Sequence, residues 1–192
     1  DLDGTVTTQE ILPLIAAELD LYEEISTLTQ ATINGLIPFE RSFKLRCKLL
    51  SDIPVNKVQE IVDGVKLNKA ITNFIKENKD DSYIVTGNIQ EWIEPIIKKL
   101  GCKTYCSKGK FINNQLTGLE KIIDKGEVVK VLKGNEKSII SIGDGMGDVA
   151  MFGESDICIA YGGVHEPIET LIKNSDYIVY DGDSLCRLLN TL

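Results

Sequence analysis

Two groups of aspartates, one near each end of the chain, have the residue types and spacing of a metal-assisted reaction centre. The first lies in the segment DLDGT (1–5) and the second in the segment GDGMGD (143–148). Carboxylates gathered in one place raise one another's pKa unless a cation lies among them. Oxygen ligands with room left for water and phosphate suit Mg²⁺. The two groups therefore predict a Mg²⁺ site whose ligands are Asp1, Asp3, Asp144 and Asp148.

Asp1 has the position of a nucleophile. A carboxylate at the end of a strand, beside a divalent cation, can attack phosphorus and form an aspartyl-phosphate. Asp3 faces the same side of an extended backbone and could protonate the leaving alkoxide, then activate water. Gly4 permits a tight turn, in which the Thr5 hydroxyl is expected to form a hydrogen bond. Taken alone, this segment could also be a solvated acidic turn.

Two further segments could hold a phosphate group. Thr86 and Gly87 follow an apolar run, and a hydroxyl with free N–H groups at a helix N-terminus binds phosphate, although an ordinary helix cap has the same pattern. Lys125 begins another helical pattern and could neutralise both the transferring phosphoryl group and the nucleophile. Lys121 and Lys130 are alternatives nearby.

The elements between these residues must bring them together. Apolar runs predict buried parallel strands at 83–86, 139–142, 157–160 and 177–180. Helical patterns alternate with them at 68–78, 89–100, 124–133, 147–153, 165–174 and 184–190. This alternation predicts an α/β fold with a doubly wound, Rossmann-like parallel sheet. The second aspartate group follows the predicted strand at 139–142, and the first would follow a strand expected before Asp1. Both groups would then lie at the carboxyl edge of the sheet, where such folds bind ligands.

Residues 10–64 have a different pattern. Four helices are expected there, at 10–19, 22–33, 38–50 and 55–63, with no strand among them. We therefore predict two domains, an α/β core (1–9 and 65–192) and a helical cap (10–64) inserted after the first strand. A cap in this position can exclude water from the site below it. A hairpin is expected at Asn113-Asn114, and an apolar strand is expected to precede Asp1.

Composition narrows the function further. A net charge of −8 argues against nucleic acid as a partner, and no apolar stretch is long enough to cross a membrane. The five cysteines have no paired spacing, which indicates reduced thiols and a cytoplasmic location. His165 is the only histidine, which excludes a three-histidine zinc site. The expected partner is a small phosphorylated metabolite, and the oligomeric state stays open.

Taken together, the four segments resemble the haloacid dehalogenase superfamily of phosphotransferases over essentially the whole chain. The segment 1–5 is similar to its first motif, Thr86 to the second, Lys125 to the third, and Asp144 with Asp148 to the fourth. The resemblance implies a phosphatase that forms an aspartyl-phosphate on Asp1. The helical insert resembles the small cap of the subfamily that contains the phosphoserine phosphatases.

The finer resemblance is to the phosphoserine phosphatase family. There, a Glu nine residues after the nucleophile holds the serine amino group, and a Phe and an Arg on a cap helix contact the substrate. Glu10, Phe39 and Arg46 stand at the matching positions, and Ile33 at that of an apolar contact. A carboxylate for the ammonium and an Arg fork for the carboxylate are what a zwitterionic amino acid requires.

Three positions depart from the family pattern. Gly147 replaces the usual Asn and removes a side chain near the phosphate, Thr86 replaces Ser, and Asn88 replaces Gly. Two other functions stay open from the sequence. One is phosphotransfer to an alcohol or action on another small phosphorylated metabolite, and the other is a non-catalytic regulator that binds phosphate or metal.

Overall fold

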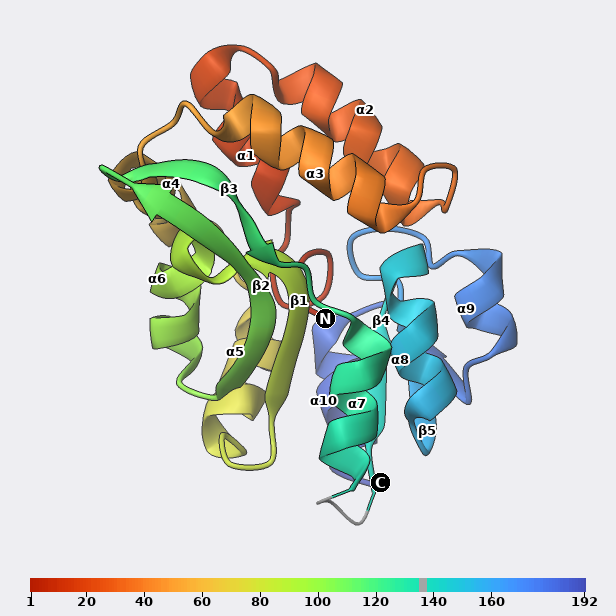
Figure 1. The fold of residues 1–192 in the computed structure, drawn as a ribbon. Helices are drawn as coiled ribbons and strands as arrows, with labels where there is room; N and C mark the ends of the chain where they lie inside the picture. The colour runs from red at the N-terminus through yellow and green to blue at the C-terminus, as the bar shows by residue number, and fades with distance from the viewer. Residues whose placement is uncertain (135–137) are drawn as a thin grey trace.

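The computed structural model describes residues 1–134 and 138–192, and its strands form two three-stranded sheets (Figure 1). In the first, β1 (Tyr83–Ile89) pairs in parallel with β2 (Lys103–Ile112), which pairs antiparallel with β3 (Gln115–Lys121). In the second, β4 (Ile140–Gly143), β5 (Ile157–Tyr161) and β6 (Tyr177–Val179) are all parallel. The predicted α/β class with parallel strands is confirmed.

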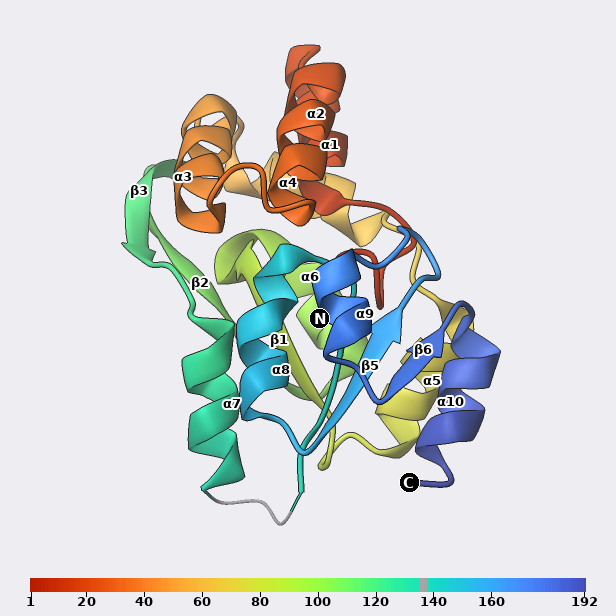
Figure 2. The same ribbon diagram turned by 90° about the vertical axis from the view of Figure 1, so that its right-hand side faces the viewer.

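Helices cover both faces of these strands. The second half of the chain contributes α7 (Lys125–Lys133), α8 (Val149–Glu154), α9 (Glu169–Lys173) and α10 (Gly182–Leu189), and the first half contributes α5 (Lys69–Glu77) and α6 (Gln90–Leu100). Figure 2 shows α7 and α8 on one side of β4 and β5, with α5 and α10 on the other. No helix in the described residues is long and apolar enough to cross a membrane.

Four helices precede this α/β part. They are α1 (Ile11–Ala16), which continues in a 3₁₀ turn (Ala17–Leu19), α2 (Tyr22–Ile33), α3 (Phe39–Leu50) and α4 (Val55–Asp63). Figure 1 shows α1, α2 and α3 above the carboxyl ends of β1 and β4, while α4 packs against α6. The all-helical reading of this stretch is confirmed, and the division into core and cap domains stays a prediction.

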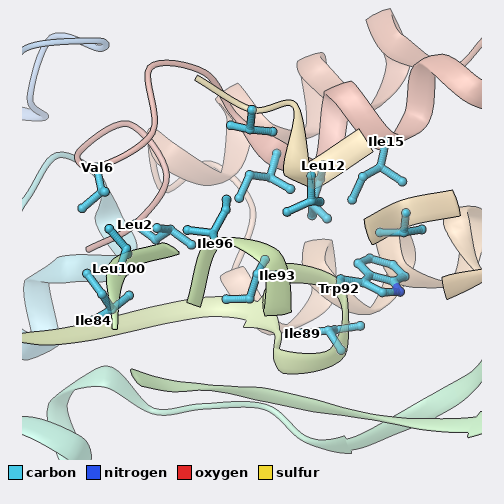
Figure 3. Close-up of a cluster of buried hydrophobic side chains, with 14 of the residues drawn as sticks. Leu2, Val6, Leu12, Ile15, Ile84, Ile89, Trp92, Ile93, Ile96 and Leu100 are labelled. Carbon is cyan, nitrogen blue, oxygen red and sulfur yellow. The ribbon is translucent and has the colours of Figure 1, made fainter. Parts of the chain in front are cut away.

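The main core holds the first aspartates in place. Leu2 is fully buried together with Ile93 and Ile96 of α6 (Figure 3). Burial of such a side chain stabilises the fold by about 2 kcal/mol. Because Leu2 is anchored in the core, its neighbours Asp1 and Asp3 are held beside the open pocket that they both line.

Local predictions were mostly accurate. Asn113 and Asn114 form the expected hairpin turn between β2 and β3, both with positive φ, at 49° and 66°. The helix predicted from residue 165 is wrong at its start, because α9 begins only at Glu169. Pro167 explains the difference, since a proline disfavours helical backbone at the residue before it. The strand expected before Asp1 is not among the described residues and stays a prediction.

Candidate active site

The two ends of the chain meet at the carboxyl end of β4. The backbone N–H of Asp1 donates to the carbonyl oxygen of Ile142 at 3.0 Å, which places Asp1 beside the loop that follows β4. Carboxylate oxygens of Asp1, Asp144 and Asp148 lie within 4.8 Å of one another. Asp148 is held by the backbone, because its Oδ2 accepts from the N–H groups of Asp144 at 3.1 Å and Gly145 at 3.2 Å.

Lys125 connects this acidic group to α7. Its Nζ lies 2.5 Å from Oδ1 of Asp1 and 2.7 Å from Oδ1 of Asp148. It is the first residue of α7, and Asp124 caps that helix by accepting the N–H of Glu127 at 3.2 Å. The rival Lys130 is exposed and pairs with Glu127 instead. The other rival, Lys121, also lines the pocket but is exposed.

Burial makes it unfavourable for Asp1, Asp144 and Asp148 all to be ionised at the same time. Burial, and then the negative charge of Asp148, raise the pKa of Asp144 well above its usual value. Burial opposes ionisation of Asp148 too, yet the charge of Lys125 and its hydrogen bond hold the pKa of that carboxyl below the usual range. Within the described residues, Oδ2 of Asp144 is buried and has no hydrogen-bond partner. An all-oxygen donor set with one free buried oxygen fits a hard divalent cation.

Asp3 lies beside these acids and is hydrogen-bonded through both oxygens. Oδ1 accepts the N–H of Ile11 at 2.9 Å, and Oδ2 accepts from the side-chain amide of Asn88. Burial, and then the charge of Glu10, raise the pKa of Asp3 to about 7. A carboxyl group with that pKa is partly protonated at neutral pH, as a general acid must be.

The segment from Thr86 to Asn88 is not a helix N-terminus, contrary to the sequence prediction. β1 runs on to Ile89, and its pairing with β2 breaks between Thr86 and Ile89. The bulge leaves Gly87 and Asn88 without strand partners, and both line the pocket. The Asn88 N–H donates to Oγ1 of Thr86 at 3.2 Å, so the hydroxyl stabilises the bulge itself.

The turn after Asp3 requires glycine. Gly4 has φ +70°, and a Cβ there would lie 2.2 Å from Oδ2 of Asp144. The hydrogen bond expected from Thr5 within this turn is not formed, because its Oγ1 is buried without a partner in the described structure. Thr7 has that role instead, with its Oγ1 3.3 Å from the Leu2 carbonyl oxygen and 2.8 Å from that of Gln9.

The helical side of the same pocket, which has a volume of about 840 Å³, carries Glu10, Phe39 and Arg46. Arg46 is only 4% exposed, and its Nη1 donates to Oγ1 of Thr29 at 2.9 Å. In the part of the chain that the structure describes, no carboxylate lies within ion-pair distance of Arg46, and burial lowers its pKa. Such a guanidinium retains most of its hydrogen-bonding capacity for a ligand.

Phe39 closes the pocket against the bulge in β1. A Cβ on Gly87 would lie 2.3 Å from Cζ of Phe39, so the ring packs directly on the glycine backbone. Phe39 also stacks on Phe43, with 5.1 Å between ring centroids. Gly87 is therefore required for the approach of α3 rather than for a positive φ.

All the candidate residues named from the sequence line this one pocket, namely Asp1, Asp3, Glu10, Phe39, Arg46, Thr86, Gly87, Lys125, Asp144 and Asp148. Sequence reasoning missed three contacts, those of Asn88 with Asp3, of Thr29 with Arg46, and of His165 with Glu10. The first could have been suspected because Asn88 departs from the family pattern. The contact between His165 and Glu10 could also have been suspected, because a single histidine in a chain of this length is conspicuous.

Comparison with known proteins agrees with this geometry. The family model for haloacid dehalogenase-like hydrolases matches residues 1–153. A phosphoserine phosphatase of Methanocaldococcus jannaschii is 29% identical over 175 residues, which cover 84% of this chain and 82% of that protein. A phosphoserine phosphatase of Lactococcus lactis is 26% identical over 84% of this chain and 81% of its own length.

Solved structures are similar over the whole chain. A phosphoserine phosphatase with an analogue of the phospho-aspartyl intermediate superposes with a TM-score of 0.85 at 25% identity, covering 100% of this chain and 96% of the other. A substrate-bound phosphoserine phosphatase complex gives the same TM-score and identity, covering 100% of this chain and 95% of the other.

Proposed function

We propose that this chain, which belongs to the haloacid dehalogenase-like hydrolases, is a Mg²⁺-dependent phosphatase that converts O-phosphoserine to serine and phosphate. The observation that carries the substrate assignment is Arg46, a buried guanidinium without a carboxylate partner among the described residues, in the same pocket as the acidic group. A buried Arg fork matches the carboxylate of an amino acid in geometry and charge.

In the proposed reaction, a carboxylate oxygen of Asp1 attacks phosphorus while the bond from phosphorus to the serine oxygen breaks. Asp3 donates its proton to the leaving serine oxygen. Asp3 then takes a proton from a water molecule, whose oxygen attacks the aspartyl-phosphate and releases phosphate, regenerating Asp1. Lys125, which contacts Asp1 and Asp148, supports the negative charge that develops on the phosphoryl group.

The residues that would hold Mg²⁺ are Asp1, Asp144 and Asp148, with the Asp3 backbone as a further ligand. The free, buried Oδ2 of Asp144 supports this assignment. When bound, Mg²⁺ supplies positive charge to the phosphoryl oxygens and to the acids around it.

The rest of the pocket would recognise the serine part of the substrate. Arg46 binds the carboxylate, Glu10 the ammonium group, and Phe39 the carbon chain. The Thr86 hydroxyl and the Gly87 backbone, on the bulge in β1, bind the phosphate. A cytoplasmic location is also part of the proposal, supported by five cysteines that are all free.

A phosphate-release assay tests the proposal. We expect release from O-phosphoserine at a higher kcat/KM than from phosphoethanolamine, which lacks the carboxylate, or glycerate 3-phosphate, in which a hydroxyl replaces the ammonium. Release should stop when Mg²⁺ is chelated and should collapse in Asp3→Asn. A different preferred substrate would refute the substrate assignment, and an unchanged rate in Asp3→Asn would remove Asp3 from the mechanism.

A further inference from the structure

His165 lies in the loop between β5 and α9, and that loop is fixed at several points. The Gly162 N–H donates to the Val179 carbonyl oxygen at 2.8 Å, and the Ile168 N–H donates to that of Asp144 at 3.3 Å. Between them, Glu166 accepts a hydrogen bond from the Tyr180 hydroxyl at 3.0 Å. The loop therefore holds His165 at a defined place beside the acidic group.

From this place, His165 reaches the residue proposed to bind the ammonium group. Its Nε2 lies 3.0 Å from Oε1 of Glu10, and the two side chains are 19% and 17% exposed. The ring also lies against the turn after Asp3, because a Cβ on Gly4 would be 3.2 Å from its Cδ2. This contact joins Glu10, the residue immediately before α1, to His165, which lies 155 residues further along the chain.

Glu10 needs such a partner to stay in the pocket. It precedes α1 without capping that helix through its side chain. Within residues 1–134 and 138–192, His165 is its one side-chain hydrogen-bond partner. The negative charge of Glu10 acts on both Asp3 and Asp144, so the three carboxyl groups repel one another to the extent that they are ionised. The hydrogen bond from His165, whose ring lies close to Glu10 and Asp144 alike, offsets that repulsion.

We propose that His165 is a positioning residue for substrate selection, which holds Oε1 of Glu10 through its Nε2–H so that Oε2 remains for the substrate ammonium. The inference rests on the proposed function, because it assigns a second residue to recognition of the amino group. His165 contacts neither the phosphoryl group nor the nucleophile in this arrangement. Its loss therefore weakens binding of the amino group and leaves the chemical steps intact.

Two variants and two substrates test this role. In His165→Ala, KM for O-phosphoserine should rise about tenfold, the loss expected for one hydrogen bond to a charged group, with kcat nearly unchanged. For glycerate 3-phosphate, kcat/KM should stay within about twofold, because that substrate has no ammonium group. His165→Gln, which can place an amide N–H near the position of Nε2, should recover most of the loss.

Controls separate this role from loop integrity. Glu166→Gln weakens the neighbouring contact to Tyr180 on the same loop and should change neither substrate's kinetics. In a Glu10→Ala background, His165→Ala should have no further effect on KM for phosphoserine. An equal loss on both substrates, or a changed Mg²⁺ requirement with an unchanged substrate ratio, overturns the inference.

The outcome also separates this inference from the proposed function. A wild-type enzyme with no preference for phosphoserine over glycerate 3-phosphate refutes the proposed function, and this inference fails with it. A preference that is present in the wild type and fully retained in His165→Ala refutes the inference alone.

Discussion

Replacement of Arg46 by methionine should move stability and activity in opposite directions. In the ligand-free protein the guanidinium is 4% exposed, its one described hydrogen bond goes to Thr29, and its Nε has no partner among the described residues. A buried charge without a counter-charge is costly, and a well-packed apolar side chain of similar size can be more stable. We expect Arg46→Met to raise the free energy of unfolding by about 1–3 kcal/mol.

The same substitution, Arg46→Met, should lower kcat/KM for phosphoserine. Two charge-assisted hydrogen bonds to the substrate carboxylate, at about 1.5–3 kcal/mol each, correspond to a fall in kcat/KM of roughly 100-fold or more. Phosphoethanolamine has no carboxylate, so its kcat/KM should change by less than about threefold. The assay is steady-state phosphate release on both substrates beside thermal unfolding without substrate, where each kcal/mol corresponds to about 2–4 °C.

The matched control is Thr29→Val. It keeps the guanidinium but removes the Thr29 hydroxyl that partners it, so the melting temperature should fall rather than rise. Two results would refute the reasoning. One is Arg46→Met unfolding at a lower temperature than the wild type, which would mean that the guanidinium stabilises the empty pocket. The other is an equal loss of activity on both substrates.

Three other predictions concern the acids and the glycines of the pocket. Because the pKa of Asp3 is raised to about 7, the native metal-free protein holds a proton that the unfolded chain releases near the ordinary aspartate pKa of 3.8. Its melting temperature should therefore fall as pH rises from about 4 to 7. Asp3→Asn should reduce that slope, and saturating Mg²⁺ should flatten it, as calorimetry would measure. Gly87→Ala places a methyl group against the Phe39 ring, so kcat/KM for phosphoserine should fall at least about tenfold while a folded circular dichroism spectrum is retained. A Cβ on Gly147 would meet no atom within 4 Å, and Gly147→Asn restores the amide typical of the family, so kcat/KM should rise without loss of melting temperature; a fall in both would show that the glycine is required.

Prediction from the sequence was accurate where short-range patterns decide the structure. Strand positions followed from apolar runs of four residues, and the helices within residues 10–64 followed from their period, as with α2 at 22–33. The Asn113-Asn114 turn followed from the tolerance of Asn for positive φ. The prediction was wrong where tertiary packing decided the local structure: β1 continues beyond its predicted end at residue 86, and the bulge there places Gly87 against Phe39 of α3.

The sequence by itself determined the chemistry that this protein can carry, because acids and glycines that follow strands, and a lysine at the start of a helix, can be identified from residue types and spacings. Only the tertiary structure decided which of these groups touch. In the folded protein Lys125, rather than Lys121 or Lys130, contacts Asp1, and His165 contacts Glu10. Those contacts span 124 and 155 residues, and they depend on how helices and loops pack against one another rather than on any local pattern.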